Sequence, residues 1–253
     1  MTKRPKKKSK ILIAFSFALT LLFTLTVADF CSNLIAIKTF SSTSSSSGQS
    51  AYAIYAIALG NFANKTSALE QSAVLQKQSG AGFVWESKNK FFVIASAYAE
   101  ENDARLVKEN LEKENLSPEI VKIEIGAITI SGNYTTAEQN ALMDAVTIYK
   151  TVFDNLYDIS VALDTKVSSE AQGLLFVADV ENLVSKTKLN FEAQFDAKLS
   201  TEVLYIKLSL ADLYKKMETL KNFAATPAQT FSSKLKQTYM ETIELNYNLC
   251  KSL

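Results

Sequence analysis

The chain has 253 residues, enough for one or two domains, and its 47% hydrophobic and 21% charged residues are typical of globular proteins. The formal net charge of +1 argues against a protein built mainly to coat nucleic acid, and the absence of histidine excludes Ser-His-Asp and Cys-His catalytic centres and His-ligated zinc. Two cysteines, Cys31 and Cys250, are too few for a disulfide framework or a four-cysteine metal site.

The N-terminal region is typical of a membrane anchor. Residues 1–10 carry six basic groups and no acid, and Ile11 to Ala28 is an uncharged run that covers about 27 Å as a helix. We therefore expect a cytoplasmic basic tail (1–10), a single-pass transmembrane helix (11–37) and later domains outside the cytoplasm. A cleaved signal peptide is the competing interpretation, with a cleavage site after Ala28.

Residues 38–50 are predicted to form a flexible linker. The stretch from Ser41 to Ser50 reads SSTSSSSGQS, and such a composition provides no side chains for a hydrophobic core.

Residues 51–126 alternate between strand and helix patterns. The apolar and aromatic stretches 51–62, 83–86, 91–98 and 119–125 predict strands, and the amphipathic stretches 64–82 and 101–115 predict helices. The order is βαββαβ, which predicts a four-stranded antiparallel sheet with both helices on one face. In the first helix, the apolar residues recur near helical spacing: Ala68, Leu69, Ala73, Val74 and Leu75.

Two half-motifs in this segment resemble those of SPOR domains. Tyr55-Ala-Ile-Ala-Leu-Gly-Asn-Phe62 is similar to the family pattern Tyr-x-Val-Gln-x-Gly-x-Phe, and Phe91-Phe-Val-Ile-Ala-Ser-Ala-Tyr98 is similar to its second copy, with Ala104 at the characteristic alanine of the following helix. The resemblance implies an extracytoplasmic module that binds peptidoglycan glycan strands stripped of stem peptides, in proteins of cell division or sporulation. Ala58 stands where the family has glutamine, and Ser96 stands where the second half has glycine.

Strand alternation assigns the side chains of this sheet to two faces. Tyr55, Ile57 and Leu59 are predicted to face the helices, and a hairpin turn at 88–89 places Trp85 opposite Phe92 on the other face. The candidate glycan-binding residues on this open face are Trp85, Phe92, Phe83, Ile94, Ala58 and Ser96. Because the face is rich in aromatic rings and poor in polar groups, two interpretations remain open: a sugar platform, or a surface covered by protein.

The same βαββαβ order occurs in RNA-binding domains, and we reject that interpretation for this chain. The segment holds 8 basic and 10 acidic residues, which provides no positive surface for phosphates.

Residues 133–253 predict a four-helix domain. Thr135-x-x-Glu138 and Ser169-x-x-Gln172 are capping boxes, and apolar residues recur at heptad spacing from Leu142 to Leu163. Further apolar stripes run through 177–191, 203–224 and 231–243, with a break expected near 196–200 and the last helix expected to start at Thr226-Pro227. The overall fold class is therefore α+β: a transmembrane helix, a SPOR-like domain and an all-α bundle.

Two functions compete on these grounds. One is a non-enzymatic, membrane-anchored envelope protein that binds denuded glycan through its SPOR-like domain, with no cofactor or metal and with the C-terminal helices as a possible protein-binding surface. The other is an envelope protein-interaction scaffold whose SPOR-like fold has lost glycan binding and packs on the helical domain or on a partner. A wall hydrolase is weaker than either, since the sequence offers no metal ligand set or nucleophile–base pair.

Overall fold

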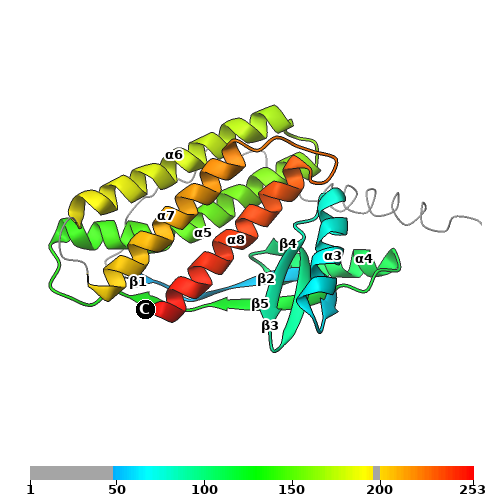
Figure 1. The fold of residues 1–253 in the computed structure, drawn as a ribbon, viewed down its shortest axis with the longest axis horizontal. Coiled ribbons are helices and arrows are strands. Elements are labelled where there is room, and N and C mark those ends of the chain that lie inside the picture. Colours follow the sequence, from blue (N-terminus) through cyan, green and yellow to red (C-terminus); the bar gives the residue numbers. More distant parts are fainter. Residues whose placement is uncertain (1–47, 196–199) are drawn as a thin grey trace, which may run out of the picture.

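A computed structural model of the chain describes residues 48–195 and 200–253. Within these ranges the protein is a mixed α+β fold with six helices, a four-stranded antiparallel sheet and a helical C-terminal half, as the sequence predicts (Figure 1). The predicted basic tail 1–10 and anchor 11–37 lie outside the described residues. No helix in the described ranges is long and apolar enough to cross a membrane.

The sheet has the predicted βαββαβ connectivity, with strand order β3-β4-β2-β5. Its strands are β2 (Tyr52–Phe62), β3 (Phe83–Ser87), β4 (Lys90–Tyr98) and β5 (Glu119–Ile125). The helices α3 (Lys65–Lys77) and α4 (Glu101–Lys113) both pack on one face, as expected.

The β3–β4 hairpin confirms the predicted register. Lys88 and Asn89 both have positive φ, 50° and 59°, the backbone that a two-residue type I′ turn requires. This turn places Trp85 opposite Phe92 and Phe83 opposite Ile94. The pairing of β2 with β4 is less regular, because its register shifts on both sides of Ala58.

Helix α3 buries only part of the apolar residues that recur at helical spacing in its sequence. Leu69 and Val74 are 51% and 45% exposed, whereas Ala68, Ser72 and Leu75 are buried. The buried positions follow a 4,3 spacing along one side of the helix, and Leu69 and Val74 lie outside that stripe. Ser72 is accommodated in the core because its hydroxyl donates a hydrogen bond to the carbonyl of Gly82.

The predicted linker extends too far, because its last residues belong to the fold. Gly48–Gln49 forms β1, which pairs antiparallel with β6 (Ile128–Thr129). Gln49 is buried, and its side-chain oxygen accepts a hydrogen bond of 3.1 Å from the amide of Asn246. Gly48 and Gln49, which the prediction placed in the linker 38–50, are therefore part of the fold.

The C-terminal half is a four-helix bundle. Its helices are α5 (Thr136–Asp164), α6 (Glu170–Gln194), α7 (Thr201–Lys221) and α8 (Phe231–Ser252). Each helix packs on its neighbour in the chain, and α8 returns to pack on α5 (Figure 1). Both capping boxes are present at the starts of α5 and α6, and the heptad residues of α5 from Leu142 to Ile159 are buried.

The last helix does not start at Thr226-Pro227, so that prediction is wrong. Thr226 and Gln229 exchange backbone hydrogen bonds of 2.9 and 3.2 Å, so Pro227 lies in a tight turn, where its fixed φ is equally suitable. Thr230 caps α8 instead, with its hydroxyl accepting from the backbone N–H of Ser233 at 3.1 Å. At the other end of this connection, α7 stops at Lys221, so Ala224 of the predicted stripe lies outside the helix.

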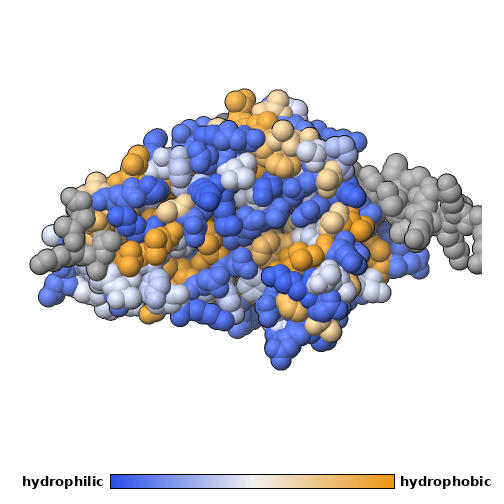
Figure 2. All heavy atoms as spheres, in the orientation of Figure 1, coloured by the Kyte–Doolittle hydropathy of each residue, from blue (hydrophilic) through white to orange (hydrophobic). Residues whose placement is uncertain are grey.

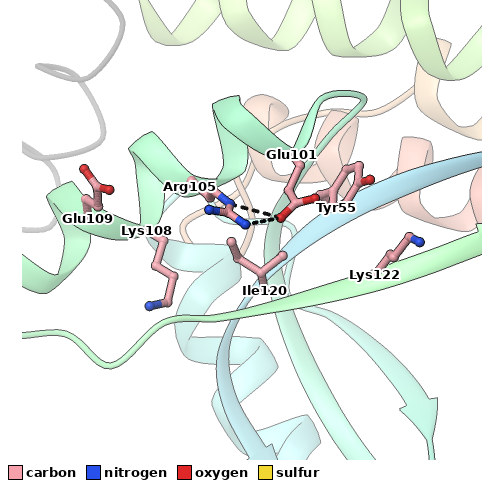
Figure 3. Close-up of a pocket in the computed structure, with 7 residues that line it drawn as sticks. All are labelled: Tyr55, Glu101, Arg105, Lys108, Glu109, Ile120 and Lys122. Atoms are coloured by element: carbon pink, nitrogen blue, oxygen red, sulfur yellow. Dashed lines mark hydrogen bonds and ion pairs between the residues drawn. The ribbon is translucent and has the colours of Figure 1, made fainter.

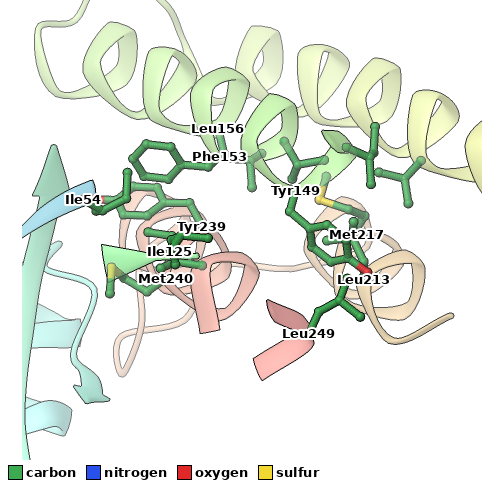
Figure 4. Close-up of a cluster of buried hydrophobic side chains, with 14 of the residues drawn as sticks. Ile54, Ile125, Tyr149, Phe153, Leu156, Leu213, Met217, Tyr239, Met240 and Leu249 are labelled. Carbon is green, nitrogen blue, oxygen red and sulfur yellow. The ribbon is translucent and has the colours of Figure 1, made fainter. Parts of the chain in front are cut away.

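The sheet and the bundle share one hydrophobic core. A single buried cluster includes Ile54 and Ile125 of the sheet together with Phe153 of α5 and Tyr239 of α8 (Figure 4). Helix α8 packs on β3, β4 and β5, on the face opposite α3 and α4. The segments 51–126 and 133–253, expected as separate domains, are therefore joined by a continuous core.

Candidate functional site

The six candidate glycan-binding residues are not on the surface as a group. Five of them are buried at the junction of sheet and bundle, with exposed fractions of 8% or less: Ala58, Phe83, Trp85, Phe92 and Ile94. Ser96 is half-buried and pairs with Ile57, which belongs to the cluster on the α4 side. The irregular pairing beyond Ile57 explains why Ser96 lies on the other face from Ile94.

Helix α8 supplies the groups that cover this face. The ring of Tyr247 meets Trp85 edge-on, with centroids 5.1 Å apart and planes at 69°. The hydroxyl of Tyr239 accepts a hydrogen bond of 3.2 Å from the backbone N–H of Ala97. Of the two interpretations of this face, the structure agrees with coverage by protein, because the aromatic rings already have protein partners.

A buried ion pair ties the two halves together beside this core. Lys236 of α8 is 3% exposed and forms an ion pair with Asp164 at the end of α5. Its ammonium also donates to the backbone carbonyl of Ser79, which follows α3, at 2.9 Å. The hydroxyl of Ser232 donates to Asp164 at 2.8 Å, so both charges have hydrogen-bond partners. This polar cluster positions the sheet on the bundle.

A groove of about 470 Å³ lies between α4 and β5 (Figure 3). It forms because α4 buries only the stripe Ala104, Val107 and Leu111, which leaves its charged side facing out over the edge of the sheet. The residues that line it are Tyr55, Glu101, Arg105, Lys108, Glu109, Ile120 and Lys122.

Two exposed ion pairs lie at this groove. Arg105 donates from Nε and Nη2 to Glu101 at 3.0 and 2.7 Å, one turn away on α4. Lys122 of β5 contacts Glu124 at 2.6 Å, with side chains that are 52% and 74% exposed. This contact lowers the pKa of Glu124 and raises the pKa of Lys122, chiefly through their shared hydrogen bond. Exposed pairs of this kind exchange partners at small cost, so they suit recognition of another charged surface.

The strand beside the groove is an edge. In the described part of the chain, β5 pairs only with β2, and no strand occupies its other side. An edge strand with a helix beside it offers backbone hydrogen bonds and side-chain contacts to an added strand. The arrangement is suited to binding a partner.

The groove is lined mainly by charged side chains. None of its seven lining residues is a serine, threonine or cysteine. Across residues 48–195 and 200–253, no group of three or more acidic or cysteine side chains is placed to hold a metal ion.

The groove was not among the predicted sites. Its residues belong to a polar helix face and to the last strand of the βαββαβ unit, both of which appear in the sequence as ordinary solvated surface. The available signal was topological: in this strand order, the last strand to be made lies at an edge.

The C-terminal helices, predicted as a possible partner surface, expose several apolar residues, of which Leu204 and Leu208 lie one turn apart on α7. The exposed large ones on α6 and α7 are Leu175, Leu189, Leu204, Tyr205 and Leu208. On the face seen in Figure 2, apolar residues are interspersed with hydrophilic ones.

Comparisons with models of known families, with curated proteins and with solved structures found no match for this chain. The likeness to SPOR domains therefore rests on the two half-motifs of the sequence.

Proposed function

We propose that this protein is a non-enzymatic, membrane-anchored interaction scaffold of the cell envelope, whose SPOR-like sheet serves the fold and not glycan binding. The observation that carries the proposal is the contact of Trp85 with Tyr247 beneath α8, which occupies the ring that a sugar would need. A pyranose platform requires free aromatic faces with polar groups beside them. The basic tail and the uncharged run 11–28 support the anchor.

The groove between α4 and β5 supports a role in binding protein. It combines an unpaired strand edge with exposed charges of both signs, and such surfaces suit an extended polypeptide, which offers both backbone hydrogen bonds and charges. Its position on the opposite side of the sheet from the bundle leaves it accessible while the core stays closed.

Sedimentation with cell-wall sacculi tests the loss of glycan binding. The full-length protein in detergent is mixed with sacculi treated with amidase, and with untreated sacculi as the matched control. We expect it to remain in the supernatant with both, while a glycan-binding SPOR protein pellets with the treated sacculi. Saturable pelleting that requires amidase treatment would overturn the proposal.

Protease accessibility tests the proposed topology. External protease added to intact protoplasts is expected to digest the folded region beyond residue 47 and to spare an epitope tag placed before residue 1. The physical reason is that the basic residues of 1–10 are retained on the cytoplasmic side. Protection of the folded region in intact protoplasts, with digestion after lysis, would contradict the topology.

A further inference from the structure

We propose that β5 pairs antiparallel with β5 of a second copy of this chain, about a two-fold axis at Ile123, which joins the two four-stranded sheets into one. The proposal rests on the proposed function, because it names the partner of the β5 edge beside the groove. The edge, the two faces of the strand and the charges along it each support this pairing.

The edge itself is suited to pairing. The seven residues of β5, EIVKIEI, include four β-branched side chains and neither proline nor glycine. Long edge strands of this kind associate with other strands unless they are covered, bulged or broken by proline. The register of β5 with β2 is regular over all seven pairs, so no bulge turns its outer edge away.

The side chains of β5 divide cleanly between the two faces of the sheet. Ile120 and Lys122 line the groove on the α4 side, and alternation places Glu124 with them. Ile123 and Ile125 are buried in the core shared with the bundle, and Val121 packs against it. A second β5 that keeps the same faces therefore brings charged side chains together on the α4 side, while Ile123 and Ile125 stay in the core of their own copy.

The charge pattern selects one register. A two-fold axis perpendicular to the sheet passes through one pair of identical residues. An axis at Lys122 or at Glu124 sets like charges directly opposite each other, and an axis at Val121 sets Lys122 opposite Ile120. Only an axis at Ile123, among these central positions, sets Lys122 of each copy opposite Glu124 of the other, twice over.

This register also uses the pair that each copy already forms. Lys122 and Glu124 contact each other within one strand at 2.6 Å, and both remain largely exposed. In the joined sheet, two such pairs form a square of alternating charges beside the groove. Opposite charges directly across a strand pair favour association, and like charges oppose it.

Charge substitutions test the register without touching the core. The mass of the full-length protein is measured by sedimentation equilibrium in density-matched detergent. We expect wild type at twice the chain mass, and Lys122→Glu and Glu124→Lys each at the mass of one chain. The double variant K122E/E124K should return to twice the chain mass, because each copy again meets an opposite charge.

A mixture of the two single variants tests the register most directly. Each is expected to be monomeric alone, whereas an equimolar mixture should form a heterodimer, since the two carboxylates of the K122E copy then face the two ammonium groups of the E124K copy. The matched control is the pair Lys188→Glu and Glu192→Lys, which changes a partly exposed ion pair on α6, and both should keep the wild-type mass. Circular dichroism confirms that each variant is folded.

Three results would overturn the proposal: a monomeric wild type, single variants that stay dimeric, or a mixture that stays monomeric. A wild type that is monomeric and does not pellet with treated sacculi would contradict the β5 pairing alone. The scaffold function would then stand with a different protein as its partner. Pelleting with treated sacculi by a dimeric protein would contradict the proposed loss of glycan binding and leave the β5 pairing in place.

Discussion

Replacing Trp85 by alanine is expected to destabilise the protein by about 3–5 kcal/mol, the usual cost of removing a large aromatic side chain from a core. Trp85 is 6% exposed and contacts Tyr247 of α8, so its loss leaves a cavity at the junction between sheet and bundle. A surface platform residue would behave differently, since its removal changes stability very little.

Urea unfolding followed by circular dichroism measures this effect, because Trp85 is the only tryptophan and the variant has no tryptophan fluorescence to follow. The matched control is Leu69→Ala on α3, a 51% exposed side chain whose truncation should change stability by about 0.5 kcal/mol or less. Equal stability of Trp85→Ala and wild type would mean that α8 does not cover the sheet in solution.

Breaking the buried ion pair from one side is expected to cost about 3–5 kcal/mol. Asp164→Ala leaves the ammonium of Lys236 buried, with the carbonyl of Ser79 as its remaining partner. Lys236→Met leaves the Asp164 carboxylate with the hydroxyl of Ser232. Each single variant therefore retains an uncompensated charge at the junction.

The double variant D164A/K236M should be much more stable than the sum of the two single losses predicts, because no unpaired charge remains. A double-mutant cycle by urea unfolding measures this coupling. The more accessible pair Lys150–Asp154 on α5 is the control cycle, with an expected coupling of about 0.3–0.5 kcal/mol for neighbours one turn apart. Additive losses at Asp164 and Lys236 would show that the pair does not act as a unit.

The features that the sequence predicts correctly depend on neighbouring residues. The capping box of Thr135 with Glu138 forms within one turn, and the heptad stripe of α5 is set by residues three and four apart. The opposition of Trp85 and Phe92 follows from a two-residue turn and from alternation along two adjacent strands. In each case the spacing of nearby residues is compatible with a single local structure.

The features that the sequence does not predict depend on distant partners. An apolar face on a sheet is compatible with a ligand, a partner or a helix, and nothing near Trp85 in the sequence identifies Tyr247 as its neighbour. Gln49 appears in a serine-rich stretch as a linker residue, yet its side-chain oxygen accepts a hydrogen bond from Asn246, which lies 197 residues later in the sequence. Pro227 suits both a turn and a first helical position, and the hydrogen bonds of Thr226 decide for the turn.

Because α8 covers the apolar face of the sheet, this face is exposed during synthesis until α8 has been made. The sheet is complete once Ile125 has been made, but α8, the helix that closes over its apolar face, is made only after α5, α6 and α7. At about 5–20 residues per second, roughly 6 to 25 s separate the two, and the face with Trp85 and Phe83 stays open on the nascent chain for that time. Any message truncated before α8 yields a protein that displays this face permanently, so such fragments should be held by chaperones or degraded.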